Sequence, residues 1–278
     1  MNGFEFACGS VIGRDHREAN KNNHDSGHWH IASDFSVAVV CDGCGSGKHS
    51  EVGAAIGARL VVAAIVNTIG KFKSSDSKDR LGGYPFWERV RQDVLAEMRV
   101  LINRMGGSFS ETVKDYFLFT VVGAVLSPVG VSFFSLGDGI VIVNGAIVRL
   151  GPFPRNEPPY LAYALVENSV IDPKGVEFNI VSHHEIGTIN SFLLGTDGVG
   201  DLIEAADTKV PGKDELVGPI NQFWTDDRFF SNPFMIGRRL ALIGRDTQTI
   251  DWKRQKMERE NGILKDDTTL IVGRRQGG

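Results

Sequence analysis

The sequence lacks three features that would assign a protein to a class at once. It has only three cysteines in 278 residues, too few and odd in number for a disulfide framework, so we expect a reducing compartment, the cytoplasm. It has no basic excess, because 34 acidic residues outnumber 30 basic ones, which argues against nucleic acid or a membrane as a partner. The first ten residues show no basic start followed by an apolar stretch, so we expect no secretory signal.

No apolar run is long enough to cross a membrane without interruption. The most apolar segment, 52–69, contains Arg59 and many alanines and glycines, so it predicts a buried helix and not a membrane span. Hydrophobic residues make up 42% and charged residues 23% of the chain, which is ordinary for a globular protein and excludes wholesale disorder. We expect a single domain over residues 1–278 with a sizeable core.

Patterns of apolar residues predict a strand-rich centre with helices on either side. We expect helices at 50–69, 85–105, 214–224, 233–244 and 250–260. We expect strands at 4–12, 29–33, 36–42, 117–126, 129–136, 140–144, 146–150, 176–182, 191–196 and 268–274. The polar or proline-rich segments 13–27, 71–83 and 151–159 are expected to be loops. Because strands and helices do not alternate as βαβ units, the expected fold class is α+β.

Aspartates recur where apolar strands end or begin. A single Asp-Gly pair is more often a turn than a functional site. Strand ends on one side of a sheet can converge, however, and a cluster of carboxylates is tolerable mainly when divalent cations neutralise it. Oxygen-only ligands favour Mg²⁺ or Mn²⁺ over zinc. The positions concerned are Asp25, Asp42-Gly43, Asp138-Gly139, Asp197-Gly198 and Asp266-Asp267.

Five motifs in this order resemble the type 2C, metal-dependent (PPM) serine/threonine protein phosphatases, particularly stand-alone bacterial members. The resemblance implies a four-layer sandwich of two antiparallel β-sheets flanked by helices on both sides. It also implies an enzyme that hydrolyses phosphoserine and phosphothreonine in phosphorylated proteins, with a Ser/Thr kinase system as a further candidate partner. The motifs are Asn23-His24-Asp25, VVCDGCGSG at 39–47, SLGDG at 135–139, FLLGTDGVGD at 192–201 and DDTTLIV at 266–272.

The resemblance implies a role for each motif residue. Asp42 would bridge two Mn²⁺ or Mg²⁺ ions, and the carbonyl of Gly43 would complete one coordination shell. Asp197 and Asp266 would hold the first ion, and Asp25 would anchor the second through water. Asp42 and Asp25 are therefore the expected catalytic residues. A hydroxide shared by the two ions would attack phosphorus in line, so no cysteine or serine nucleophile is needed.

Two further positions stay open at this point. Asp138 corresponds, with Asp197, to the place of a third and weaker ion in the family. Asp267 is the alternative to Asp266, because the sequence leaves the register of the adjacent carboxylates undecided.

The chain also departs from the family pattern. Cys44 stands where many members have a histidine that protonates the leaving alkoxide, so a metal-bound water or a nearby histidine would have to serve. Asn20 stands where many members have an arginine that clamps phosphate in bidentate fashion. The candidates to replace that arginine in substrate binding are Arg17, Arg14 and His16.

Other interpretations of the same residues remain. His24, at a position where eukaryotic relatives bind metal with a glutamate, is expected to be a solvated loop histidine. Cys41 and Cys44 are expected to be a buried strand residue and a loop thiol, with an oxidisable pair as a minor hypothesis. A nucleotide P-loop at 43–48 fails because Asp42 and His49 occupy its key positions. The functional alternatives are a catalytically weak module that binds phosphorylated partners and a hydrolase of small phosphoesters.

Overall fold

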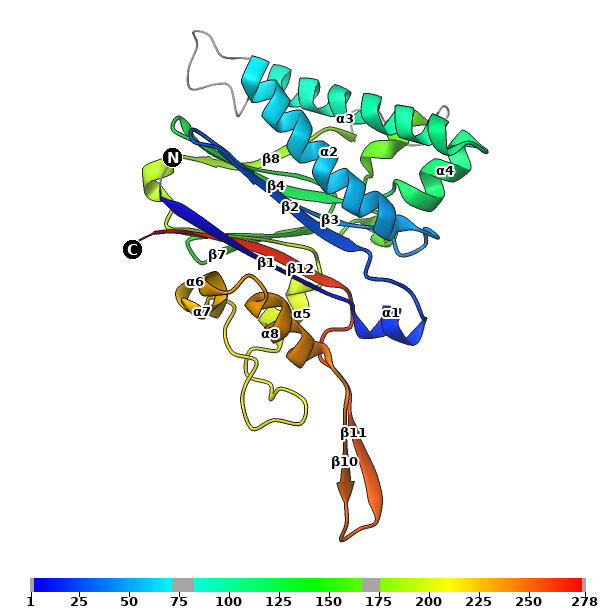
Figure 1. Cartoon of the computed structure of the whole chain (residues 1–278), viewed down its shortest axis with the longest axis vertical. Coiled ribbons are helices and arrows are strands. Elements are labelled where there is room, and N and C mark those ends of the chain that lie inside the picture. The colour runs from blue at the N-terminus through cyan, green and yellow to red at the C-terminus, as the bar shows by residue number, and fades with distance from the viewer. Residues whose placement is uncertain (1–2, 72–82, 167–175, 277–278) are drawn as a thin grey trace.

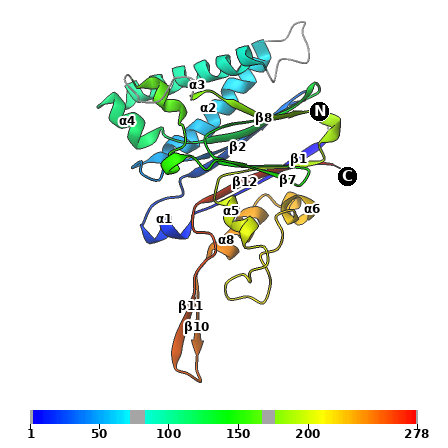
Figure 2. The ribbon, with the colours of Figure 1, turned by 180° about the vertical axis from the view of Figure 1, so that it is seen from behind.

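Figure 1 shows the computed structural model, which describes residues 3–71, 83–166 and 176–276. Two five-stranded antiparallel sheets stack on each other, and helices cover their outer faces, as the view from behind also shows (Figure 2). The strand order is β1-β12-β9-β6-β7 in sheet A and β2-β3-β4-β5-β8 in sheet B. The predicted α+β class and the four-layer sandwich are therefore confirmed.

Most strands lie where the alternation of apolar residues predicts them. Sheet A contains β1 (Phe4–Val11), β12 (Thr268–Arg275), β9 (Ser191–Gly195), β6 (Gly139–Val143) and β7 (Ala146–Leu150). Sheet B contains β2 (Asp25–Ile31), β3 (Ser36–Asp42), β4 (Val121–Ser127), β5 (Gly130–Leu136) and β8 (Asn179–His184).

The outer helices differ between the two faces. Sheet B is covered by two long helices, and α3 begins at a tyrosine followed by proline, a favoured residue in the first turn. The helices on the side of sheet B are α2 (Ser50–Lys71), α3 (Tyr84–Met105) and α4 (Phe109–Tyr116). Those near sheet A are α5 (Val199–Glu204), α6 (Gln222–Thr225), α7 (Arg228–Ser231) and α8 (Met235–Gly244). Helix α1 is Arg14–Glu18, and the 3₁₀ helices are η1 (Pro154–Asn156), η2 (Leu161–Leu165) and η4 (Ile186–Thr188).

Strand β3 shows why an unbroken apolar run belongs at the centre of this fold. Val37, Val39 and Cys41 belong to the core beneath the helices of sheet B. Ala38 and Val40 belong instead to the core between the two sheets. Successive side chains of a strand point to opposite faces, so both faces of β3 are buried, as its sequence predicts.

Helix α2 is long and apolar enough to cross a membrane by length and composition alone. It packs against β2, β3 and α3, and half of its most apolar window is buried inside the protein. Burial of this kind is typical of a core helix, which agrees with the prediction for 52–69.

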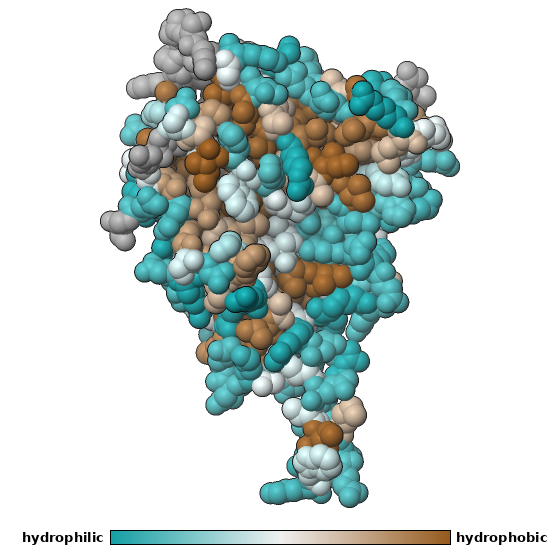
Figure 3. All heavy atoms as spheres, viewed as in Figure 1, coloured by the Kyte–Doolittle hydropathy of each residue, from teal (hydrophilic) through white to brown (hydrophobic). Residues whose placement is uncertain are grey.

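The helix predicted at 250–260 is wrong. This segment belongs to an antiparallel hairpin of β10 (Thr247–Asp251) and β11 (Lys256–Glu260), which projects from the body (Figure 1). Its basic run from Lys253 to Lys256 therefore lies at a hairpin tip and not on a helix face. Figure 3 shows a small hydrophobic patch on this mainly hydrophilic hairpin, where Ile250 and Met257 are 51% and 67% exposed.

Other differences are smaller. The expected loop at 13–27 contains α1 and the first residues of β2. The helix expected at 214–224 is reduced to α6 near its end, and α4 and α5 were not predicted. The expected connection at 71–83 lies almost wholly outside the described residues.

Candidate metal centre

Two aspartates of sheet B lie directly opposite each other. Asp25 begins β2 and Asp42 ends β3, and the two are partners in the antiparallel register of these strands. Residues paired in this way have neighbouring side chains on one face of the sheet. Asp25 is buried, with 8% of its surface exposed, and the backbone carbonyl of Asp42 accepts a 2.8 Å hydrogen bond from the Thr120 amide.

Three aspartates of sheet A arrive at the same place. Gly195 pairs with both Ile140 and Leu270, so β6, β9 and β12 are aligned across the sheet. Asp138 precedes β6, Asp197 follows β9 and Asp266 precedes β12, and all three side chains therefore emerge from one end of the sheet. Together with Asp42 they line one cavity of about 740 Å³.

The turn that carries Asp138 depends on glycine. Gly137 and Gly139 adopt φ values of 92° and 137°, in the region that L-residues with side chains rarely enter. This turn connects β5 of sheet B to β6 of sheet A. The SLGDG motif therefore places a carboxylate between the two sheets, and its glycines make the crossing possible.

Without cations the cluster carries a strong electrostatic cost. Burial raises the pKa of Asp25 well above its ordinary 3.8, and the nearby carboxylates of Asp267, Asp197 and Asp266 raise it further. Burial and the charge of Asp25 raise the pKa of Asp42 in the same way. Asp197 lines the cavity, but partial desolvation by the surrounding protein raises its pKa to about 7, and the charge of Asp266 contributes to this shift. Divalent cations would relieve this repulsion.

One buried oxygen also lacks a partner. Oδ2 of Asp25 accepts a 2.7 Å hydrogen bond from Thr196 Oγ1, whereas its Oδ1 is buried without any hydrogen bond. An unsatisfied buried carboxylate oxygen is costly unless water or a cation reaches it. The donor set contains only oxygens, so these residues fit Mg²⁺ or Mn²⁺.

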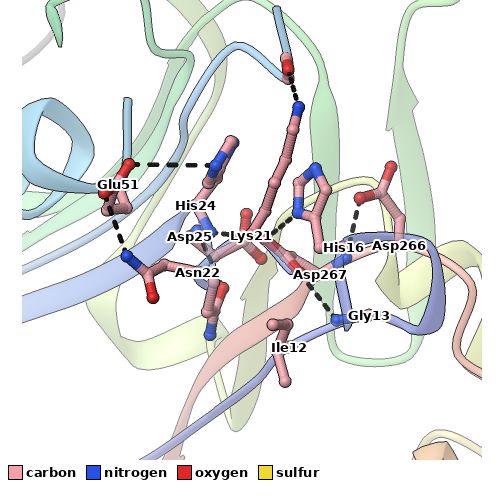
Figure 4. Close-up of polar contacts among 12 residues, drawn as sticks. Ile12, Gly13, His16, Lys21, Asn22, His24, Asp25, Glu51, Asp266 and Asp267 are labelled. Carbon is pink, nitrogen blue, oxygen red and sulfur yellow. Dashed lines mark hydrogen bonds and ion pairs between the residues drawn. The ribbon is translucent and has the colours of Figure 1, made fainter. Parts of the chain in front are cut away.

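The structure separates the adjacent aspartates of the last motif. Asp267 is 2% exposed and accepts hydrogen bonds from the amides of Gly13 and His24, at 2.7 and 2.5 Å. Its Oδ2 also lies 2.8 Å from Nδ1 of His16 (Figure 4). Asp266 is exposed and faces the cavity. Because the oxygens of Asp267 already have three donors, Asp266 is the better metal ligand.

The three candidate substrate-binding residues lie in different places. Arg17 donates to the carbonyls of Gly244 and, at 3.3 Å, of Ile12. Arg14 donates to the carbonyl of Gly262 at 3.3 Å, and neither arginine lines the cavity. Only His16 does, with its ring held by Asp267. Helix α1 therefore brings one of the three candidates to the aspartates.

Asn20, the residue at the expected arginine position, suits its local backbone. Asn20 adopts a left-handed conformation with φ 52°, which asparagine tolerates far better than most residues. The next residue, Lys21, donates from Nζ to the carbonyl of Gly45 at 2.6 Å, as Figure 4 shows for the lysine beside His16.

The expectation of a solvated His24 is wrong. This side chain is 2% exposed, its Nδ1 lies 3.1 Å from Ser50 Oγ, and its Nε2 lies 3.9 Å from Glu51 Oε2. Burial lowers the pKa of His24, and the neighbouring His16 lowers it further. Its imidazole therefore belongs to the packing that joins the loop before β2 to the start of α2.

The two cysteines near the aspartates behave as predicted. Cys41 and Cys44 are both free thiols. Cys41 is buried in β3, and burial raises its pKa well above the usual value. Cys44 lines the cavity. Burial alone would raise its pKa, but hydrogen bonds with Ser46 and Tyr160 lower it overall.

One side of the cavity was not predicted from the sequence. Its lining includes Val113 and Lys114 of α4, Tyr163 of η2, and Tyr160 just before η2. Two sequence features lie there: a pair of tyrosines three residues apart, at 160 and 163, and a serine at 108. In the structure Ser108 is the N-cap of α4 and accepts from the Glu111 amide at 3.5 Å. Neither pattern says that the two segments meet.

Comparisons with known proteins agree with this architecture. The family model described as protein phosphatase 2C matches residues 12–230. The solved structure of a bacterial serine phosphatase is similar, with 13% identity, 99% coverage of each chain and a TM-score of 0.52. Stp1 from Staphylococcus aureus, a serine/threonine phosphatase, has 14% identity and a TM-score of 0.50, with 99% of this chain and 96% of that chain covered. No curated protein sequence matches this chain.

The two solved structures share so little sequence with this chain that they support the fold alone. The family model is more specific, because its match spans most of the chain and includes four of the clustered aspartates, Asp25, Asp42, Asp138 and Asp197. On this evidence the chain belongs to the protein phosphatase 2C family of serine/threonine phosphatases.

Proposed function

We propose that this protein hydrolyses phosphoserine and phosphothreonine in phosphorylated proteins with the help of two Mn²⁺ or Mg²⁺ ions. The observation that carries the proposal is the convergence of aspartates from both sheets on one cavity, with an unsatisfied oxygen of Asp25 buried beside it. Asp42, Asp25, Asp197, Asp266 and the carbonyl of Gly43 are the proposed ligands of the two ions. Asp138, with Asp197, is the proposed place for a third and weaker ion.

The protein supplies positioning and proton transfer in this proposal. When bound, the divalent ions neutralise charge on the phosphoryl group and make water a better nucleophile. Thr196 holds one oxygen of Asp25 at 2.7 Å and so orients its carboxylate. Asp267 holds His16 through Nδ1 at 2.8 Å, which leaves Nε2 of the ring free to hold a proton at the cavity. His16 is the proposed donor of that proton to the leaving serine or threonine oxygen.

The cellular setting is also proposed. Three unpaired thiols support a reducing compartment such as the cytoplasm. Phosphorylated serine and threonine arise from phosphoryl transfer to hydroxyl groups, so a Ser/Thr kinase must supply the substrates. No observation favours the alternative of a catalytically weak module that binds phosphorylated partners.

A direct test measures phosphate release from phosphoserine and phosphothreonine peptides with Mn²⁺. Turnover should disappear with a chelator. It should fall by about 10³-fold or more in Asp42→Asn, because this side chain is a proposed metal ligand that lies beside proposed ligands from both sheets. Absence of turnover by folded wild type with Mn²⁺ bound would overturn the enzymatic proposal. Full activity of Asp42→Asn would overturn the assigned metal site.

A further inference from the structure

The cavity at the aspartates is larger than a phosphoryl group requires. Its volume of about 740 Å³ lies within the range of pockets that enclose drug-sized molecules, about 300–1,000 Å³. The aspartates supply only part of its lining, and they come from strand ends. The remaining space is bounded by different elements with different chemistry.

A second wall of the cavity is mainly apolar and aromatic. It comes from α4, from Leu118 just after α4, and from the segment around η2. The residues used here are Val113, Lys114, Leu118, Tyr160, Tyr163 and Val166, and we call them the apolar wall.

The apolar wall is anchored in the core and is therefore preformed. Val113, Leu118 and Tyr160 are at most 7% exposed and belong to the hydrophobic core beneath α2 and α3. The rings of Tyr160 and Tyr163 pack edge to face, with centroids 5.5 Å apart and planes at 64°. Backbone hydrogen bonds of 3.1 Å from Tyr163 to Tyr160 and 3.3 Å from Val166 to Tyr163 hold the segment. Binding to such a preformed surface costs little conformational entropy of the protein.

Lys114 gives the apolar wall a charge. Its side chain is exposed at the cavity and makes no ion pair with any residue in the described part of the chain, unlike Lys48, which pairs with Asp115 at 2.9 Å. The apolar surface favours apolar groups, and the charge of Lys114 favours acidic groups and disfavours basic ones. Glu157 also lines the cavity, but its charge is paired with Arg155 at 2.9 Å.

We propose that the apolar wall binds the side chain that neighbours the phosphorylated residue of the substrate, and that it selects large apolar side chains over lysine and arginine. The inference rests on the proposed phosphatase function. Consecutive Cα atoms lie 3.80 Å apart, so a residue one or two positions away from a phosphoserine at the aspartates reaches the second wall of the same cavity. An apolar side chain at that position would be removed from water by packing against Tyr163 and Val166.

The test is a series of phosphoserine peptides that differ at one position. Leu, Phe, Gly or Lys is placed in turn at each position from two before to two after the phosphoserine, in an otherwise Gly/Ala sequence. At one or more positions, kcat/KM with Mn²⁺ should be about ten- to hundredfold higher for Leu or Phe than for Gly, and lowest for Lys. Equal values for all four residues at every position would overturn the inference while leaving the phosphatase function intact.

Two variants locate the effect. In Tyr163→Ser the ratio of kcat/KM between Leu and Gly peptides should fall at least threefold towards one, and in Lys114→Glu the Lys peptides should improve at least threefold relative to Gly. The matched controls are Tyr84→Ser, at an exposed tyrosine in α3, and Lys256→Glu, on the projecting hairpin. Both controls should keep the wild-type ratios, and thermal melting reports whether each variant is folded.

Each remaining outcome has a defined meaning. Unchanged ratios in folded Tyr163→Ser and Lys114→Glu would overturn the assignment of selectivity to the apolar wall. Absence of turnover on every peptide by folded wild type with Mn²⁺ would overturn the proposed function and this inference together. Turnover with selectivity in wild type, lost only in the two wall variants, would support both.

Discussion

Asp25 and Asp42 face each other across the paired ends of β2 and β3. One oxygen of Asp25 has no hydrogen-bond partner. Burial raises the pKa of both carboxyls, and the charge of Asp25 raises that of Asp42 further. In the absence of cations this arrangement opposes folding at neutral pH. The strands therefore hold two like charges close together. The packing of the core and, in our proposal, bound ions offset the free-energy cost of this repulsion.

The metal-free protein should lose stability as pH rises. Carboxyls whose pKa is raised in the fold bind more protons in the folded than in the unfolded state as pH rises above 3.8, for Asp197 up to about pH 7. Their contribution to the free energy of unfolding therefore decreases as pH rises through that range. Asp42→Asn removes part of the repulsion. In chelator, urea unfolding should show this variant more stable than wild type at pH 8, by about 1–3 kcal/mol, and less so at pH 5.

The same experiment with saturating Mn²⁺ provides the control. Wild type should gain stability by mass action, and the variant should gain less, so their order reverses. A stability difference that is equal at pH 5 and pH 8 in chelator would contradict the assigned repulsion.

Asp266 and Asp267 should respond in opposite ways to substitution. Asp267→Ala leaves the amides of Gly13 and His24 without their buried acceptor, so unfolding should become easier by about 3 kcal/mol or more. Asp266→Ala removes a carboxylate that repels Asp25 and Asp197, so the metal-free protein should be at least as stable as wild type at neutral pH. Calorimetric titration with Mn²⁺ should nevertheless show weaker binding for Asp266→Ala. The reverse pattern would indicate that Asp267 is the ligand.

The fold was predictable where one pattern dominated. The run of apolar residues in β3 and the proline at the start of α3 determine those elements locally. The hairpin at 247–260 was not predictable, because its alternating Thr, Ile, Met and charged residues lie outside the core, where apolar periodicity carries no information. Helix α4 is short, and it packs against α2, α3 and η2, which the sequence does not show.

The aspartates of the site were predictable from the sequence motifs, but the role of the residues in the loop before β2 was not. Each aspartate sits at a strand end, so the pairing of strands within each sheet and the stacking of the two sheets bring them together. Arg14, His16 and Arg17 share one short helix, and the sequence offers no means to tell which faces the cavity. Asp267 decides this, because its buried carboxylate binds His16, and contacts between residues 251 positions apart are not visible in a sequence.

His16→Gln should impair substrates according to their leaving group. A serine alkoxide needs a proton as it departs, whereas p-nitrophenolate does not, so loss of a proton donor should slow the phosphoserine peptide by about 10²-fold and p-nitrophenyl phosphate far less. His30→Gln, at an exposed histidine of β2, is the control and should affect neither substrate. Equal losses on both substrates would mean that His16 serves binding or structure and does not donate the proton.

Gly53→Ala should disturb the cavity by displacing the end of α4. A Cβ at Gly53 of α2 would lie 1.5 Å from the carbonyl oxygen of Tyr116, so the end of α4 must move, at a cost of about 1–3 kcal/mol. Gly70→Ala is the matched control, because nothing lies within 4 Å of its Cβ and alanine favours the helix by up to about 1 kcal/mol. The expected result is a lower melting temperature and reduced discrimination between Leu and Gly phosphopeptides for Gly53→Ala alone. Equal behaviour of the two variants would show that contact between α2 and α4 does not shape the apolar wall.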